Sequence, residues 1–416
     1  MSGWAASAEA EPLTMEAAVA TALERNLGLI AARLQVREAE VLRVAAGMLP
    51  NPEVEYSVGN VVLGEGNDQE RGLRPRPFEQ TIQSIGVSAV LDVWLKRSTR
   101  VEAAAHGIRE ARLQVEDAVR EIRRAVRSAY AEVVREEAER RLAATTRGQY
   151  DESIALSRKR FNAGDISEAE LRKVELEGLR YVNAEIDATL QLEVARQRLA
   201  ELMAYPDPAA LPRELVEPAI LPTLDVGDEE ALLRGALSQR PDLLAATAAR
   251  QRATSELRAE QRLPLPDPSL GVAYTRSRFQ VSGDNPHALG LSLSIPIPVF
   301  DRNQAGIGRA RIEIERAELE VTRTDLAVRH DVAEALAQAR RARRLLETYE
   351  AGGMLERARS ALDVAERSYQ SGSSSLLEIL EARRTYLETQ ANYLAARYDH
   401  WQAAIDVAYA TGGELP

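Results

Sequence analysis

The chain has 416 residues, and its 64 acidic residues outnumber its 53 basic ones to give a formal net charge of −11. A nucleic-acid partner, which requires a basic face on the protein, is excluded on this ground. Cysteine is absent, so we expect no disulfide, no thiolate metal site and no lipid anchored through cysteine. No stretch is apolar over the roughly 18 residues that a membrane-spanning helix needs, although membrane strands would leave no such stretch.

The start of the chain, 1–11, has no charged or apolar stretch, but Ala6-Ser7-Ala8 is typical of the end of a signal peptide. We expect 1–11 to be a residual signal or N-terminal tail. An internal repeat follows, because Arg25-Asn26-Leu27-Gly28-Leu29-Ile30-Ala31-Ala32 returns as Arg240-Pro241-Asp242-Leu243-Leu244-Ala245-Ala246, each in a stretch of amphipathic helical pattern. Each stretch ends in a similar breaker, Leu49-Pro50-Asn51-Pro52 or Leu265-Pro266-Asp267-Pro268. The expected repeats are 12–204 and 228–413, joined by a Pro-rich linker at 205–227.

After each breaker the hydrophobic period changes to two, which indicates strands. The expected strands are 53–62 and 81–94 in the first repeat and 269–279 and 287–299 in the second, with exposed loops at 63–80 and 280–286. The last strand alternates most clearly, with apolar residues at every second position: Leu289, Leu291, Leu293, Ile295, Ile297 and Val299. Pro296 and Pro298 indicate a strand end or a bulge there. Four strands cannot close a barrel, but three copies would supply twelve.

Long helices are expected after each strand pair, at 97–160 and 302–368, which would be rods of about 100 Å if continuous. Gly352-Gly353 predicts a break in the second rod. Both rods reach a matching turn, Phe161-Asn162-Ala163-Gly164 and Tyr369-Gln370-Ser371-Gly372, after which a second helix returns. The last helix carries an apolar coiled-coil seam that Arg384 interrupts. The predicted fold is therefore mainly α with a small β part.

Over essentially its whole length the sequence resembles the TolC-type outer-membrane efflux channel family. The resemblance rests on the repeat order, the 49–52 breaker, the two glycine turns and Leu376-Leu377-Glu378-Ile379-Leu380-Glu381-Ala382. It implies a homotrimer, four strands per subunit forming a shared twelve-stranded barrel in the outer-membrane lipid, and a helical coiled-coil tunnel across the periplasm. The implied partners are a periplasmic adaptor (membrane fusion) protein and an inner-membrane RND-type pump. No cofactor and no enzymatic activity are expected.

The stretch 294–304, with Leu95-Lys96-Arg97 in the first repeat, is similar to the cobalt-zinc-cadmium branch of heavy-metal efflux channels. We therefore expect a passive exit duct for heavy-metal cations. Many relatives carry an acylated N-terminal cysteine, which this chain lacks.

Four groups of site residues follow from the pattern and the resemblance. An outward-facing membrane band is expected at Leu289, Leu291, Leu293 and Ile295, and an aromatic girdle at Trp94, Phe300, Tyr56 and Tyr274, unless these aromatics are simply enriched in strands. The resemblance assigns adaptor-contacting tips to Gly164, Asp165, Gly372 and Ser373, which could also be plain helix stops. It also assigns the tunnel constriction to Glu378, Glu381, Glu170 and Tyr369, which could instead be ordinary side chains on a solvated rod. Ser374 stands where the family has a basic gate residue.

Two alternatives stay open. The same fold could export drugs or other organic solutes, and a soluble coiled-coil scaffold would explain the long helices but not the alternating strand. A metal-dependent enzyme is disfavoured, because His106, His287, His330 and His400 lack ligand spacing and no catalytic motif is present.

Overall fold

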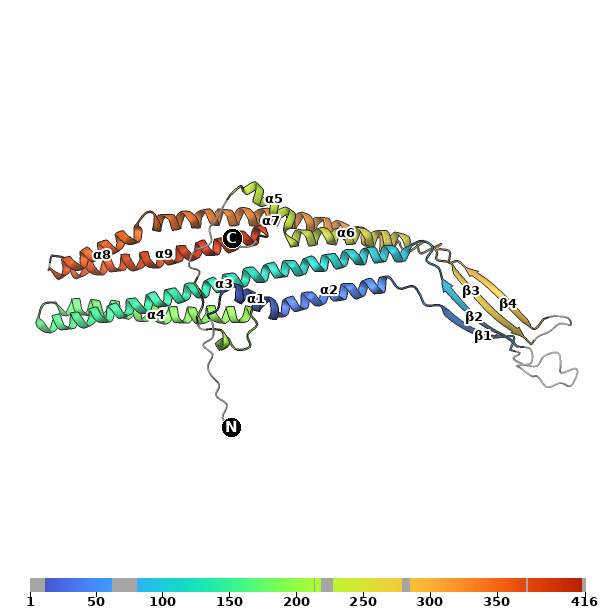
Figure 1. Ribbon diagram of the computed structural model, residues 1–416, viewed down its shortest axis with the longest axis horizontal. Helices are drawn as coiled ribbons and strands as arrows, with labels where there is room; N and C mark the ends of the chain where they lie inside the picture. Colours follow the sequence, from blue (N-terminus) through green and yellow to red (C-terminus); the bar gives the residue numbers. More distant parts are fainter. Residues whose placement is uncertain are drawn as a thin grey trace, which may run out of the picture. The chain divides into compact units, whose positions relative to one another are not determined.

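A computed structural model describes residues 12–61, 81–212, 214–217, 227–278, 285–371 and 373–413. The expected N-terminal tail, the whole of the first strand loop, most of the second, part of the linker and Gly372 lie outside these residues. The helices are α1 (Met15–Arg25), α2 (Leu27–Ala46), α3 (Lys96–Ala163), α4 (Glu168–Leu202), the short 3-10 helix η2 (Pro208–Ala210), α5 (Glu229–Gln239), α6 (Pro241–Arg262), α7 (Gln304–Glu350), α8 (Met354–Gln370) and α9 (Leu376–Thr411) (Figure 1). The strands are β1 (Glu53–Gly59), β2 (Ile82–Val90), β3 (Ser269–Ser277) and β4 (His287–Ser294). The expected fold class, mainly helical with four strands, is confirmed.

The chain forms two compact units, and each unit draws on both sequence repeats. The first contains the segments up to Leu34, Leu113–Leu244 and the segment from Arg323 onward. The second contains Gln35–Arg112 and Ala245–Thr322, which include all four strands. A sequence repeat is therefore not a compact body of its own, because corresponding segments of the two repeats pack together in each unit.

The repeated motif around Arg25 and Arg240 lies in a helical stretch, as expected, and each copy marks a short break between two helices. Asn26 ends α1, and its side-chain oxygen accepts the backbone N–H of Leu29 at 3.1 Å in the first turn of α2. Arg240 ends α5, and Pro241 is the first residue of α6. Proline suits a first helical position because its missing N–H has no partner to lose there.

The four strands form one antiparallel sheet in the order β1-β2-β3-β4. Every strand ends earlier than the alternating pattern predicted, at Gly59, Val90, Ser277 and Ser294. Pro296 and Pro298 lie beyond the end of β4, where the loss of two backbone N–H donors does not interrupt a ladder.

A buried lysine fixes the junction between the sheet and the helices of the second unit. The Lys96 ammonium donates to the backbone carbonyls of Leu263 and Leu265 and to the Asp267 carboxylate, the last at 2.8 Å. Its side chain is 10% exposed, so the three acceptors replace the water that the charge has lost. The second breaker motif is thereby tied to the start of α3.

The long helix α3 is uninterrupted over 68 residues. It is rich in Ala, Arg and Glu, which favour helix, and ion pairs such as Arg135–Glu132 and Arg140–Glu137 lie along its surface at i,i+3 spacing. The second rod is broken as predicted: α7 ends at Glu350, and Gly353, with φ +60°, precedes α8. A side chain at Gly352 would meet the Thr348 carbonyl oxygen at 2.2 Å, which explains why this position has none.

The core of the first unit joins α1, α3, α4 and α9. Its largest fully buried side chains include Tyr130, Leu199, Trp401 and Ile405. The Tyr130 hydroxyl donates to the Leu13 carbonyl at 2.6 Å and meets the Val216 carbonyl at 2.9 Å. Burial of this phenol raises its pKa to about 12, so it remains a donor throughout the physiological range.

Candidate functional site

The cross-strand register places the expected membrane band on one face of the sheet. Residues opposite one another in adjacent antiparallel strands share a face. Leu289, Leu291 and Leu293 therefore each belong to a row of side chains that crosses the sheet on one face. The row of Leu289 contains Tyr56, Ile85 and Tyr274, and the row of Leu291 contains Val54, Val87 and Val272. The row of Leu293 contains Ala89 and Leu270. Leu291 in the middle row is 82% exposed. We call this the apolar face; it is continuous over the sheet.

The expected girdle residues occupy two levels. Tyr56 and Tyr274 lie in one row of the apolar face. Trp94 and Phe300 lie between the strand ends and the helices that follow, where the Trp94 indole donates to the Pro266 carbonyl at 2.8 Å and Phe300 is 91% exposed. Ile295, the fourth band residue, also lies beyond the end of β4 and is exposed.

The opposite face of the sheet carries small residues and two carboxylates. Glu53 lies in a row with Ser88, Gly271 and Ser292, and Glu55 in a row with Gly86, Ala273 and Gly290. Among the strand residues of the described chain, Glu53 and Glu55 are the ionisable side chains on this small-residue face. The alternation predicted small or polar residues here, but these two glutamates were not singled out.

The first predicted tip is a tight reversal between α3 and α4. Gly164 has φ +82°, and the Asp165 backbone N–H donates to the Arg160 carbonyl at 2.9 Å. The left-handed angle ends α3 and favours glycine. The second tip contains Ser373, whose backbone N–H donates to the Ser368 carbonyl at 2.9 Å; Gly372 lies outside the described residues.

At these tips the structure brings Tyr369 against Arg160. The guanidinium carbon of Arg160, in the last turn of α3, lies 4.9 Å from the centre of the Tyr369 ring at the end of α8. Glu170 instead closes a capping box: its carboxylate accepts the Ser167 backbone N–H at 2.8 Å. Hydrogen bonds from the Ser167 backbone and hydroxyl, with smaller contributions from Lys173 and Arg160, lower the pKa of Glu170.

Glu378 and Glu381 lie in the first two turns of α9, and both are exposed. Glu381 forms an ion pair with Arg384 at 2.9 Å, while the Ser375 hydroxyl caps the helix by accepting the Glu378 backbone N–H. Arg384 was predicted only as an interruption of the apolar seam, and Arg160 was not among the predicted site residues. Their signals were weak: Arg384 stands three residues after a predicted gate glutamate, and Arg160 four residues before the turn glycine.

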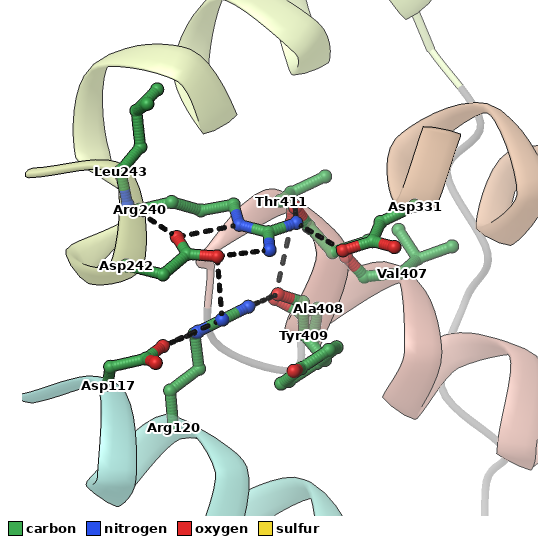
Figure 2. Close-up of polar contacts among 11 residues, drawn as sticks. Asp117, Arg120, Arg240, Asp242, Leu243, Asp331, Val407, Ala408, Tyr409 and Thr411 are labelled. Carbon is green, nitrogen blue, oxygen red and sulfur yellow. Dashed lines mark hydrogen bonds and ion pairs between the residues drawn. The ribbon is translucent and has the colours of Figure 1, made fainter. Parts of the chain in front are cut away.

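A network of arginines and carboxylates joins α3, α6, α7 and α9 within the first unit (Figure 2). The Arg240 side chain is 2% exposed and pairs with Asp242 at 2.5 Å and with Asp331 at 2.9 Å. Arg120 reaches Asp117 at 2.7 Å and Asp242 at 3.3 Å. Burial alone would raise the pKa of Asp242, but the hydrogen bond from Arg240 and the charges of Arg120 and Arg240 outweigh it and hold that pKa below its usual value.

The part of the chain that the structure describes contains no group of three or more His, Cys, Asp or Glu placed to hold a metal ion. None of the helices described is both long and apolar enough to cross a membrane.

The family described as outer membrane efflux protein matches residues 18–204 and 232–413. The cobalt-zinc-cadmium resistance protein CzcC of Cupriavidus metallidurans is 25% identical over 401 residues, covering 96% of this chain and 90% of CzcC. The pyoverdine export outer membrane protein OpmQ of Pseudomonas putida is also 25% identical, covering 99% of this chain and 87% of OpmQ. The solved structure of the outer membrane protein VceC of Vibrio cholerae shares the fold, with a TM-score of 0.77 at 18% identity over 97% of both chains.

Proposed function

This chain belongs to the outer membrane efflux protein family, and from that premise we propose that three copies form an exit duct for heavy-metal cations. Membership makes the protein an outer-membrane efflux channel of a Gram-negative envelope and not an enzyme. The homotrimer, the docking on a periplasmic adaptor and an inner-membrane RND-type pump, and the metal substrate are the further steps of the proposal.

The continuous apolar face is the observation that carries the membrane assignment. Leu289, Leu291 and Leu293 form rows with apolar and tyrosine side chains from the other three strands. β1 and β4 are the edges of this sheet, so β1 of one copy pairing with β4 of the next would close a barrel of twelve strands. The apolar face would then meet lipid, and aromatic residues at two levels would flank it as membrane barrels require. In a soluble scaffold this apolar face would remain exposed to water, which is unfavourable.

The small-residue face would line the duct and favours a cationic substrate. Three copies would bring six carboxylates, from Glu53 and Glu55, to that lining, and rings of carboxylates attract cations. The similarity to CzcC, a cobalt-zinc-cadmium resistance protein, points the same way. The similarity to OpmQ, a pyoverdine export protein, supports the second candidate, an organic solute.

The tip and constriction residues remain part of the proposal. Gly164, Asp165, Gly372 and Ser373 are assigned to the ends of the two helical hairpins that would contact the adaptor. Glu378, Glu381, Glu170 and Tyr369 are assigned to the narrow end of the tunnel. Two observations support these assignments: the turn sequences of the two hairpins are similar, each with an aromatic residue three positions before a glycine, and Glu378 and Glu381 are both exposed.

The test is a gene deletion complemented with wild-type protein or with one of two variants of neighbouring β4 residues. Leu291→Arg puts a charge on the apolar face, which costs roughly 2–4 kcal/mol at bilayer depth in each subunit. We expect it to lower trimer yield in the outer membrane and to abolish resistance. Ser292→Arg, on the small-residue face, is the matched control and should keep normal trimer yield. Equal yields of the two variants would contradict the assignment of the faces.

The same strains identify the substrate class by growth on cobalt, zinc and cadmium salts and on a panel of drugs. Sensitivity of the deletion strain to the metals, restored by the wild-type gene, is the expected result. Sensitivity to organic compounds alone would replace the metal substrate while leaving the channel in place.

A further inference from the structure

The two faces of the sheet carry charged side chains of different kinds, acidic on one face and basic on the other. Glu53 and Glu55 lie on the small-residue face, whereas Arg276 and His287 lie opposite each other on the apolar face. Their row, which also contains Val58 and Gln83, follows directly after the row of Tyr56 and Tyr274. The strand residues that the structure describes place no carboxylate on the apolar face.

Along the apolar face the chemistry changes in order from aliphatic to aromatic to cationic. The row of Leu291 is aliphatic, the next row contains both tyrosines, and the next contains Arg276 and His287. Successive rows are two residues, or about 7 Å, apart along the strands. A lipid layer presents acyl chains, then an interface that favours tyrosine, then phosphates, in the same order and on a similar scale.

The geometry of His287 leaves one ring nitrogen for an external partner. The Tyr274 hydroxyl contacts Nδ1 of His287, and the two rings stack with centroids 5.8 Å apart. The His287 backbone N–H donates to the Asn285 side-chain oxygen at 3.0 Å, which fixes the start of β4. Nε2 is therefore the ring nitrogen that can meet a ligand. Arg276, the cross-strand partner of His287, is exposed and carries a guanidinium with five donors.

We propose that Arg276 and His287 form a docking surface for the phosphate headgroup of an anionic membrane lipid, at the boundary of the apolar face formed by the end of β3 and the start of β4. This inference rests on the proposed function, because it requires the apolar face to meet lipid. Arginine matches phosphate oxygens with paired N–H donors, and Tyr274 orients His287 beside it. In a trimer three such surfaces would hold the barrel at a fixed depth.

The experiment uses purified full-length trimer reconstituted in vesicles of phosphatidylcholine alone or mixed with phosphatidylglycerol. The lipids retained after gentle extraction are counted for the wild type, for Arg276→Gln, for His287→Gln and for the double variant. Wild-type protein should retain phosphatidylglycerol in excess of its share of the vesicle, and Arg276→Gln should lower that excess about fivefold. Arg311→Gln, an exposed arginine of α7 in the same unit, is the control and should retain it.

Each result decides the inference. If the double variant retains as much phosphatidylglycerol as the wild type, the docking surface is wrong while the membrane assignment stands. If inorganic phosphate alone binds the wild-type trimer in detergent, Arg276→Gln abolishes that binding and retention of phosphatidylglycerol is unchanged by the variant, the surface is a site for free phosphate and the lipid assignment is overturned. If wild-type protein fails to enter either kind of vesicle while correctly trimeric in detergent, the proposed function fails first and the inference falls with it.

Discussion

The contact between Arg160 and Tyr369 joins residues that stand more than 200 positions apart in the sequence. The family motif identified Tyr369, and helix-end rules identify Arg160 as a cation in the last turn of α3. Neither signal says which side chain meets the tyrosine ring, because that depends on how α3 and α8 lie beside each other. The sequence can therefore predict which residues belong to such a site, but it does not predict which of them contact one another.

We expect the aromatic ring of Tyr369, not its hydroxyl, to hold the tip closed. An exposed cation–π contact contributes about 0.5–1 kcal/mol, so Arg160→Gln and Tyr369→Leu should each raise the open fraction a few-fold in planar bilayers. Tyr369→Phe retains the ring and should behave nearly as the wild type. If Tyr369→Phe opens the channel as much as Tyr369→Leu does, the hydroxyl is the important group and the role of Arg160 is refuted.

Arg240 illustrates a residue whose role only the structure shows. We expect Arg240→Met to lower the free energy of unfolding by roughly 1.5–3 kcal/mol near neutral pH, because Asp242 keeps only its 3.3 Å contact with Arg120 and the half-exposed Asp331 loses its partner. The pKa of Asp242 is lowered in the folded state, so its stabilisation is complete above its ordinary pKa of 3.8 and is lost as the pH falls through the lower folded value.

Denaturant unfolding of the detergent-solubilised protein, followed by the fluorescence of the buried Trp401, measures both effects. The wild type should lose stability progressively below about pH 4, and Arg240→Met should lose much less over the same range. Glu230→Gln, an exposed position in the nearby helix α5, is the control. A variant with wild-type acid sensitivity would show that Arg240 is not the main partner of Asp242.

At the scale of elements, the sequence predicted boundaries well where a local determinant sets them. Gly352-Gly353 predicted the break between α7 and α8, and Gly164 the end of the first hairpin helix. The breaks at Asn26 and Arg240 were not predicted, since a one-residue interruption leaves the helical period of apolar residues nearly intact. Strand ends were overestimated because the alternation of Ile295, Ile297 and Val299 continues after the ladder has stopped.

Two glycines, one inside α3 and one just after its end, should respond in opposite directions to replacement by alanine. Gly148 lies within the helix with open space around its Cα, so Gly148→Ala should raise stability by about 0.5–1 kcal/mol. Gly164 also has open space, but its φ of +82° strains any L side chain, so Gly164→Ala should lower it by about 1–2 kcal/mol. Thermal unfolding and amide exchange at the tip are the measurements. Stabilisation by both variants would mean that the turn does not need the left-handed angle.

At the scale of the whole molecule, the twofold repeat was visible in the sequence, but the partition into compact units was not. Helices α3 and α7 each contribute to both units, because a single long helix can pack against different partners along its length. Periodicity reports which residues face a neighbour and not which neighbour they face. The trimer adds a further level, in which each side chain at the constriction would be repeated three times.

Ion selectivity at the proposed constriction should follow the number of charges that the three subunits place there. Glu378 would contribute three negative charges to the trimer, whereas Glu381 pairs with Arg384 at 2.9 Å, so this pair adds little net charge. Glu378→Gln and Glu381→Gln should therefore each lower the preference for cations, and Arg384→Gln should raise it. The double variant Glu381→Gln with Arg384→Gln has the same net charge as the wild type and should restore its selectivity.

Reversal potentials of single trimers across a salt gradient measure this preference. The differences should be large near 0.01 M salt, where the Debye length is about 30 Å, and small near 1 M, where it is about 3 Å. Glu230→Gln, an exposed glutamate of α5, changes the charge of each subunit outside both tips and serves as the control. If Arg384→Gln leaves the selectivity unchanged at low salt, the first turns of α9 do not line the narrow part of the conduction path, because a change of three charges there must alter the local potential.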